Sequence, residues 1–252
     1  MIRFSILNFK RTIFKSLNTF YFSRKKQQEN IEFNINLDKE KISQAADELK
    51  MRDFTYIENF LTNESYQSLL KHWPNINHFY HLKKITKHYN VGFKYDPKNL
   101  TIDKTFKNYM SKYTLKQFYS FLISEKFKKF YEKLINIKDD DFHVGSILST
   151  MASNNSYLMP HYDGVSHNSS FKKGYNFIYF IDGYEKDSIP EGATGIYQDS
   201  EFKLPILIPK TIKNSLLIYN TNSTNFYHGF KNIVCPKNIF RKSINCHIIL
   251  KK

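Results

Sequence analysis

The stretch YLMPHYDG, residues 157–164, carries the strongest structural signal in this chain. His161 and Asp163 stand at positions i and i+2 of a run with strand composition, so both side chains leave the same face of the strand. An imidazole and a carboxylate on one face can hold a metal ion between them. The stretch therefore predicts a β-strand that offers two metal ligands at its end.

Short strands are predicted on both sides of this stretch, from about residue 143 to residue 250. Apolar residues there recur with a period of two, and clusters of Gly, Asn, Pro and Lys separate the runs. Eight short strands with no helix between them favour an antiparallel sandwich or jelly roll. The predicted strands are 143–150, 156–163, 175–182, 194–199, 204–209, 214–220, 225–230 and 241–250.

The preceding part of the chain, from about residue 37 to residue 137, is predicted to be helical with loops. Residues 38–51 are good helix formers, and residues 62–73 open with Thr62 or Asn63 as a capping residue. Residues 114–137 repeat Phe, Leu and Ile every three or four positions, which indicates a pair of surface helices. No low-complexity linker follows, so we expect these helices to buttress one sheet of a single domain, residues 31–252.

The composition excludes a wholly disordered chain, because 41% hydrophobic and 17% aromatic residues can form a core. A formal net charge of +15 attracts anionic partners, but the basic residues are spread along the chain rather than clustered in a stripe. This distribution disfavours nucleic acid as the main partner. The two cysteines, Cys235 and Cys246, lack metal-site spacing and suit a reducing compartment, so a cytoplasmic location is expected.

The N-terminal extension, residues 1–30, is basic and amphipathic, and its first 28 residues contain no acidic residue. Charges interrupt every apolar run, which excludes a membrane-spanning helix and argues against a secretory signal. A docked N-terminal helix is the favoured interpretation. A transit peptide, or an anchor that lies on a membrane surface, stays open as an alternative.

Three further residues extend the metal-binding pattern towards the C-terminus. His228, in the predicted strand 225–230, is the natural third ligand, and two imidazoles with one carboxylate form a facial triad with open positions. Arg241 and Ser243 stand at i and i+2 of the last strand and face one side. A guanidinium matches a carboxylate geometrically, and a serine hydroxyl adds a donor. These two residues therefore predict a carboxylate clamp beside the metal.

In this order the five residues resemble the motif of the 2-oxoglutarate- and iron(II)-dependent oxygenases, most nearly their prolyl-hydroxylase-like branch. The resemblance covers about residues 143–250 and is fainter at residues 59–74, NFLTNESYQSLLKHWP. It implies an α+β fold, in which a double-stranded β-helix (a cupin-like jelly roll) is buttressed by N-terminal helices. It also implies iron(II) on His161, Asp163 and His228, and the far carboxylate of 2-oxoglutarate on Arg241 and Ser243.

The same resemblance implies a dioxygenase that consumes O₂ and 2-oxoglutarate, with ascorbate as an auxiliary reductant. It would hydroxylate an organic substrate and release succinate and CO₂. That substrate would be a protein side chain, a sugar or lipid-linked intermediate, or a small metabolite. Substrate recognition is expected in the helical part and in the loops 164–174 and 183–192, because binding residues tend to lie on loops.

Two departures from the motif affect the cosubstrate site. Many relatives carry a tyrosine where this chain has Phe180, so we expect Tyr179 or Tyr157 to supply the hydroxyl instead. The paired glycines of the relatives are separated here, as Gly192 and Gly195.

Three alternatives stay open at this point. The positive charge would suit a nucleic-acid oxidative demethylase of the same superfamily. A cupin-like metal-binding protein without redox turnover would use the same barrel but has no need of Arg241. An interaction protein directed to a surface by residues 1–28 would not need His161. The other strand histidines, His143, His167 and His247, are expected to be structural.

Overall fold

The computed structural model describes residues 31–76, 79–81, 89–90, 93–95, 109–138, 142–163 and 174–250. The predicted N-terminal extension, residues 1–30, and His167 lie outside the described residues, and the domain boundary at residue 30 stays a prediction. None of the described helices is both long enough and apolar enough to span a membrane.

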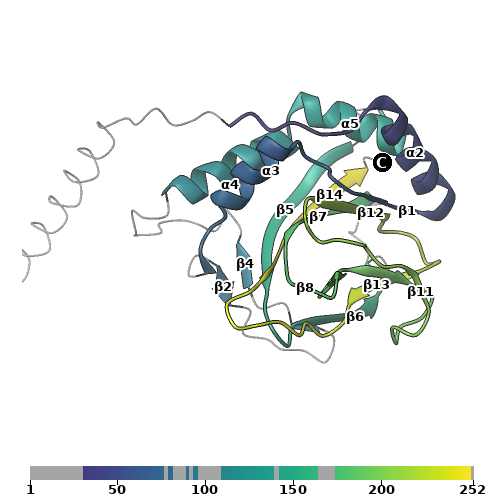
Figure 1. Cartoon of the computed structure of the whole chain (residues 1–252). Helices are drawn as coiled ribbons and strands as arrows, with labels where there is room; N and C mark the ends of the chain where they lie inside the picture. The colour runs from purple at the N-terminus through teal and green to yellow at the C-terminus, as the bar shows by residue number, and fades with distance from the viewer. Residues whose placement is uncertain are drawn as a thin grey trace, which may run out of the picture.

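Two antiparallel sheets face each other and form the double-stranded β-helix (Figure 1). Among the described strands, the larger sheet has the order β1-β12-β7-β14-β5-β4-β2 and the smaller one the order β11-β10-β13-β6-β3. The larger sheet consists of β1 (Phe54–Ile57), β2 (Tyr80–His81), β4 (Phe93–Tyr95), β5 (Phe142–Ala152), β7 (Gly174–Asp182), β12 (Ser215–Asn220) and β14 (Arg241–Leu250). The smaller sheet consists of β3 (Tyr89–Asn90), β6 (Tyr157–His161), β10 (Gly195–Tyr197), β11 (Pro205–Leu207) and β13 (Tyr227–Phe230).

Each of the eight predicted strands has a counterpart in these sheets, and the predicted fold class is confirmed. Several short strands were not predicted. They are the hairpin of β8 (Glu185–Lys186) and β9 (Ile189–Pro190), and the strands β2, β3 and β4 within the region predicted to be helical. A further one is β1, which lies between two helices in the sequence and pairs with β12 at the edge of the larger sheet. A four-residue strand is too short for its alternation to be distinguished from a loop.

The helices begin where side chains can cap them. Asp38 caps α2 (Lys39–Arg52) and accepts a hydrogen bond from the backbone N–H of Lys41. Thr62, rather than Asn63, caps α3 (Asn63–Lys71). The predicted helix pair is α4 (Tyr109–Leu122) and α5 (Glu125–Ile135), and Ser124 separates the two because it caps α5.

The helices cover one face of the larger sheet, on the side away from the smaller sheet (Figure 1). Aromatic rings fill this layer, and Phe127 of α5 makes edge-to-face contacts with Phe60, Phe121 and Tyr131. Tyr131 in turn packs on Phe177 of β7, with 4.8 Å between the ring centroids. Burial of each such side chain stabilises the fold by about 1.5–3 kcal/mol, so the helical layer holds the larger sheet in place.

Alternation along the central strands divides their side chains between two environments. On β7, Phe177, Tyr179 and Ile181 face the helices, whereas Ile178 and Phe180 belong to an apolar cluster between the two sheets. On β14, Ile244, Cys246 and Ile248 face the helices. The alternate residues of both strands therefore line the interior of the barrel.

Candidate metal centre

Strand pairing brings the three predicted metal ligands together inside the barrel. His161 is the last residue of β6, and it stands directly opposite His228 of β13 in the antiparallel pair. Asp163 follows two residues after His161. The ring centroids of the two histidines are 4.3 Å apart. His161, Asp163 and His228 each offer one ligand atom, and these atoms all lie within 4.8 Å of one another.

One carboxylate oxygen is shared between the two imidazoles. Asp163 Oδ1 lies 3.5 Å from His161 Nε2 and 3.4 Å from His228 Nε2. His161 Nδ1 donates to the carbonyl of Met159 at 2.9 Å, and because a carbonyl can only accept, the neutral ring carries its lone pair on Nε2. The three atoms that face one another are therefore suited to hold one cation.

A glycine allows the two ligand-bearing strands to approach closely. The register between β13 and β6 shifts between His228 and Phe230, where the partner residues are His161 and Leu158. A Cβ atom at Gly229 would lie only 2.4 Å from the carbonyl oxygen of Leu158. Any other residue at this position would push β6 away, so Gly229 helps to keep His161 beside His228.

The electrostatics of the triad favour an ionised carboxylate. Burial alone would raise the pKa of Asp163, but hydrogen bonds to His161, His228 and Tyr219 outweigh it and hold that pKa well below its usual range. Burial lowers the pKa of His228. For His161, burial is outweighed by the hydrogen bonds to Asp163 and Met159, and its pKa is raised. The carboxylate and a neutral His228 are thus already in the protonation states that a metal requires.

Two residues that the sequence did not single out adjoin the triad. The hydroxyl of Tyr219, on β12, lies 2.9 Å from Asp163 Oδ2 and 2.9 Å from His228 Nε2. Asn176, on β7, donates from Nδ2 to the Tyr219 hydroxyl at 2.7 Å. Tyr219 pairs directly with Asn176 across β12 and β7. Alternation predicts only which residues of one strand share a face, and it is the pairing of β7 with β12 that puts Asn176 and Tyr219 on the same face of the sheet.

Arg241 lies inside the barrel with 5% of its surface exposed. Its guanidinium carbon is 4.6 Å from the ring centroid of Phe230 and 5.2 Å from that of Phe180, and its Nη2 donates to Thr194 Oγ1 at 2.8 Å. Within the described residues no acidic side chain pairs with it, and Nε has no hydrogen-bond partner. Burial lowers its pKa to about 9. Such a guanidinium requires an anion.

Ser243 shares the inner face of β14 with Arg241. It is fully buried, and its hydroxyl lies 2.8 Å from the hydroxyl of Thr150 on β5. Arg241 and the triad are linked by β13, because Phe230 packs against the guanidinium and His228 stands two residues earlier on the same strand. Two strand residues span roughly 7 Å, so the cation site and the guanidinium face the same short stretch of interior.

The structure corrects the expectation for Tyr179. Its side chain lies in the helical layer, where its ring contacts Phe60 and Phe118 and its hydroxyl donates to Asn214 at 2.9 Å. Phe180, one residue later, is the one that faces Arg241. The prediction that Tyr179 binds the cosubstrate is wrong, because neighbouring residues of a strand point to opposite faces.

Tyr157 is also not placed beside Arg241. It is half-buried at the start of β6. The next residue, Leu158, packs on the cluster of Ala152 and Phe230 beside Arg241. Because side chains alternate along the strand, Tyr157 points to the other face, and we do not include it in the cosubstrate site.

The strand histidines expected to be structural differ in their positions. His143 is exposed on β5. His247 is half-buried on the inner face of β14; burial lowers its pKa, and the charges of Asp163 and His228 also act on that pKa. His247 therefore lies close to the triad, which the sequence alone did not indicate.

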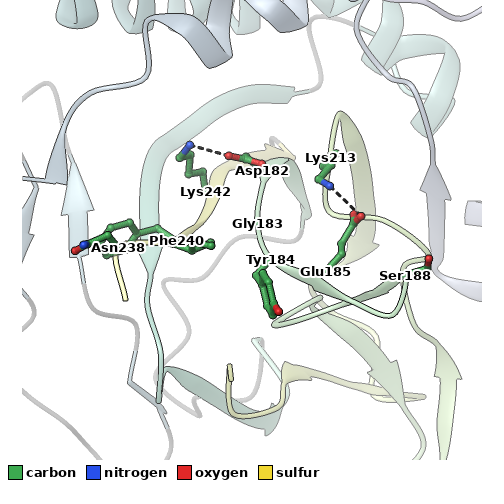
Figure 2. A pocket seen from close by; sticks show the side chains of 10 residues that line it. Asp182, Gly183, Tyr184, Glu185, Ser188, Lys213, Asn238, Phe240 and Lys242 are labelled. Atoms are coloured by element: carbon green, nitrogen blue, oxygen red, sulfur yellow. Dashed lines mark hydrogen bonds and ion pairs between the residues drawn. The ribbon is translucent and has the colours of Figure 1, made fainter. Parts of the chain in front are cut away.

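The segment 183–192 lies at the Arg241 end of the barrel. A Cβ at Gly192, where φ is +77°, would approach the Arg241 side chain to 3.2 Å. The segment lines a cavity of about 590 Å³, in which Lys242 pairs with Asp182 and Lys213 pairs with Glu185 (Figure 2). None of the residues that line this cavity belongs to the triad, and a role of 183–192 in substrate recognition stays a prediction. The other predicted loop, 164–174, lies outside the described residues up to residue 173.

No protein-family model matches the sequence, and no curated protein matches it. Solved structures are similar in fold. A prolyl hydroxylase from Trichoplax adhaerens, in complex with a hypoxia-inducible-factor peptide fragment, has a TM-score of 0.55 at 11% identity, over 85% of this chain and 94% of that chain. An oxidoreductase of the 2OG-Fe(II) oxygenase family from Burkholderia pseudomallei has a TM-score of 0.53 at 10% identity, over 87% and 95%.

A third similar structure is the non-haem α-ketoglutarate-dependent epimerase SnoN from nogalamycin biosynthesis. Its TM-score is 0.59 at 9% identity, over 84% of this chain and 83% of that chain. Identities this low establish shared architecture rather than shared activity. The chain thus has the fold of the 2-oxoglutarate- and iron(II)-dependent oxygenases, prolyl hydroxylases included, as the sequence resemblance implied.

Proposed function

We propose that this chain is an iron(II)- and 2-oxoglutarate-dependent dioxygenase that hydroxylates an organic substrate and releases succinate and CO₂. One observation carries the proposal. The interior of a single barrel holds a cluster of two imidazoles and a carboxylate together with a buried guanidinium that has no acidic partner among the described residues. The cluster of imidazoles and carboxylate suits iron(II), and the guanidinium suits a dicarboxylate bound beside the metal.

The donor set fits iron(II). His161, Asp163 and His228 would hold it through Nε2, Oδ1 and Nε2, and three protein ligands leave positions for a cosubstrate. Together with 2-oxoglutarate and O₂, the metal would supply the oxidation of an unactivated C–H bond. Asp163 supplies one negative charge, and burial keeps His228 neutral, so the site needs to lose few protons when the cation binds.

The Arg241 region fits the far carboxylate of 2-oxoglutarate. The rings of Phe180 and Phe230 both pack against the guanidinium, and Nη2 donates to Thr194. The remaining donors are directed by this packing, and the buried Nε gains a partner when an anion arrives. Ser243 adds a hydroxyl on the same face. The apolar rings around the guanidinium also exclude water, which strengthens its attraction for a carboxylate.

The primary substrate approaches from the triad side. The side chains of His161 and Asp163 are 39% and 25% exposed, whereas Arg241 is buried. A protein side chain, a sugar or lipid-linked intermediate, and a small metabolite are all compatible with this opening. The peptide-bound Trichoplax prolyl hydroxylase and the epimerase SnoN show how different the reactions on this fold are. A non-redox metal-binding protein is disfavoured, because it has no use for Arg241.

Anaerobic addition of iron(II) and then 2-oxoglutarate tests the proposal. The chelate of 2-oxoglutarate on iron gives a visible metal-to-ligand charge-transfer band, which we expect in the intact protein. We expect His161→Ala and Asp163→Ala to abolish the band. His143→Ala is the matched control, because this strand histidine is exposed and does not belong to the cluster of ligand atoms. No band in the intact protein, or an undiminished band in His161→Ala, would contradict the proposal.

Admission of O₂ then addresses the substrate. Succinate release, with ascorbate as reductant, would be followed for peptides, sugars, small metabolites and methylated nucleic acids. Methylated nucleic acids are included because the net charge of +15 attracts phosphates. If they stimulate succinate release, the stimulation should weaken steeply as the salt concentration rises. Both cysteines are free, as expected in a reducing compartment, and a cytoplasmic location is part of the proposal.

A further inference from the structure

Among the described residues, Tyr219 is a buried group in direct contact with the predicted metal ligands that the proposed function does not use. It is 1% exposed, and its hydroxyl contacts both Asp163 and His228. We propose that Tyr219 and Asn176 form a positioning pair, which makes Asp163 a one-oxygen ligand and so keeps the neighbouring coordination positions open for the cosubstrate. This inference rests on the proposed function, because it concerns the same metal.

The two oxygens of Asp163 have different surroundings. Oδ1 lies 3.5 Å and 3.4 Å from the Nε2 atoms of His161 and His228. Oδ2 lies 2.9 Å from the Tyr219 hydroxyl. A carboxylate that used both oxygens would occupy a further coordination position. The hydrogen bond to Oδ2 holds that oxygen away from the cation, which leaves Oδ1 as the ligand atom.

Asn176 sets the direction of the Tyr219 proton. A phenol has one proton to donate, and its oxygen can accept. Because the Nδ2 of Asn176 donates to this oxygen at 2.7 Å, the phenol proton is left for Asp163 or His228. A cation on His228 uses the lone pair of Nε2, so Asp163 Oδ2 becomes the acceptor. Asn176 therefore donates to Tyr219, and Tyr219 donates to Asp163.

The sheet holds this pair rigidly. Tyr219 and Asn176 are directly opposite each other in the β12–β7 register, and Phe54 of β1 pairs with Tyr219 from the other side. The Tyr219 ring packs on His228 with 4.4 Å between the centroids, and Phe226 meets it edge-on. A hydroxyl fixed in this way can orient a ligand without rearranging when the metal arrives.

The experiment compares metal binding in the intact chain, Tyr219→Phe and Asn176→Ala. The matched control is Tyr179→Phe, which removes a buried hydroxyl from the opposite face of the same sheet. Affinity for Mn(II) would be measured by titration, and coordination geometry by the visible spectrum of the Co(II)-loaded protein. We expect Tyr219→Phe to weaken binding about 10–100-fold and to change the Co(II) spectrum. Asn176→Ala should have a smaller effect in the same direction.

Each outcome separates the two proposals. If the intact chain binds no metal, the proposed function fails together with this inference. If it binds metal and Tyr219→Phe gives the same affinity and spectrum, only this inference fails. A phenolate-to-iron(III) charge-transfer band that Tyr219→Phe removes would also overturn it, because Tyr219 would then be a ligand. Should Tyr219→Phe not fold, Asn176→Ala decides, and an unchanged affinity and spectrum there would contradict the positioning pair.

Discussion

The two faces of the larger sheet differ in what they contribute to the protein. The helix-facing side is apolar and aromatic, and its side chains are in contact with α2, α4 and α5. On the barrel-facing side, the same strands carry polar groups. Asn176 Oδ1, Arg241 Nε and Asn245 Oδ1 have no hydrogen-bond partner among the described residues. One face therefore supplies most of the apolar burial, and the other carries polar groups that a bound ligand can satisfy.

This division implies that substitutions on the two faces separate stability from binding. The largest expected effect is on the helix-facing side. Phe127→Ala removes a ring that is 1% exposed and packs on Phe60, Phe121 and Tyr131, so it should lower the free energy of unfolding by about 3–5 kcal/mol. Chemical denaturation measures this loss. The control is Lys129→Ala, on the exposed side of the same helix, which should change the free energy of unfolding little. A loss below about 1 kcal/mol for Phe127→Ala would contradict the stabilising role of the helix-facing side.

Arg241→Met should show the opposite behaviour. The loss of a charge-assisted clamp is expected to weaken 2-oxoglutarate binding about 100-fold, which corresponds to about 2.7 kcal/mol. The free energy of unfolding should stay unchanged or increase, because the substitution removes a buried charge without an acidic partner. Titration of the charge-transfer band and thermal melting measure the two effects.

The control for Arg241→Met is Lys242→Met, which alters the next residue of β14. Lys242 pairs with Asp182 in the neighbouring cavity, so 2-oxoglutarate affinity should be retained (Figure 2). Equal losses of affinity in both variants would mean that the barrel-facing side holds no specific clamp.

The pH dependence of metal binding should depend mainly on one histidine. The pKa of His161 is raised, so below that value a proton on its imidazole competes with the metal, whereas the pKa of His228 is lowered and this ring is already neutral. Affinity for Mn(II) should fall about tenfold for each pH unit below the pKa of His161. A fall of a hundredfold per unit would show that both rings lose protons.

In the metal-free protein, the raised pKa of His161 makes the folded state more stable at low pH, whereas it weakens metal binding there. A raised pKa means that the folded chain holds the His161 proton more tightly than the unfolded chain. Its stabilising contribution is full below the ordinary histidine pKa and disappears as the pH rises through the raised value. Thermal melts of the metal-free protein across this range measure that contribution.

The smallest expected effect concerns Tyr179. Tyr179→Phe removes the hydrogen bond to Asn214 and should cost about 1 kcal/mol of unfolding free energy, with no change in the affinity for 2-oxoglutarate. Denaturation and charge-transfer titration on the same preparation measure both quantities. A weaker affinity for 2-oxoglutarate in this variant would contradict the assignment of Tyr179 to the helical layer.

Much of the fold could be predicted from local patterns. Eight of the ten described strands from residue 142 on, all but those of the β8–β9 hairpin, were predicted from a period of two and from turn residues. Thr62 was one of the two residues predicted to cap α3. The spacing of His161 and Asp163 predicted that their side chains share a face. The positions of His228 and Arg241 later in the chain predicted the third metal ligand and the carboxylate clamp. Very short strands such as β1 could not be predicted, because four residues carry too little periodic signal.

The sequence by itself indicated His161 and Asp163 as candidate ligands on one face, because alternation along one stretch of backbone is a local property. Which side of each strand faces the barrel, and which strands are neighbours, was decided only by the tertiary structure. That packing placed Tyr179 under the helices and brought Tyr219, Asn176 and Thr194 to the site from strands and loops far apart in the chain. The physical reason is that hydrogen-bond pairing and burial act between distant segments, and a single sequence does not record their register.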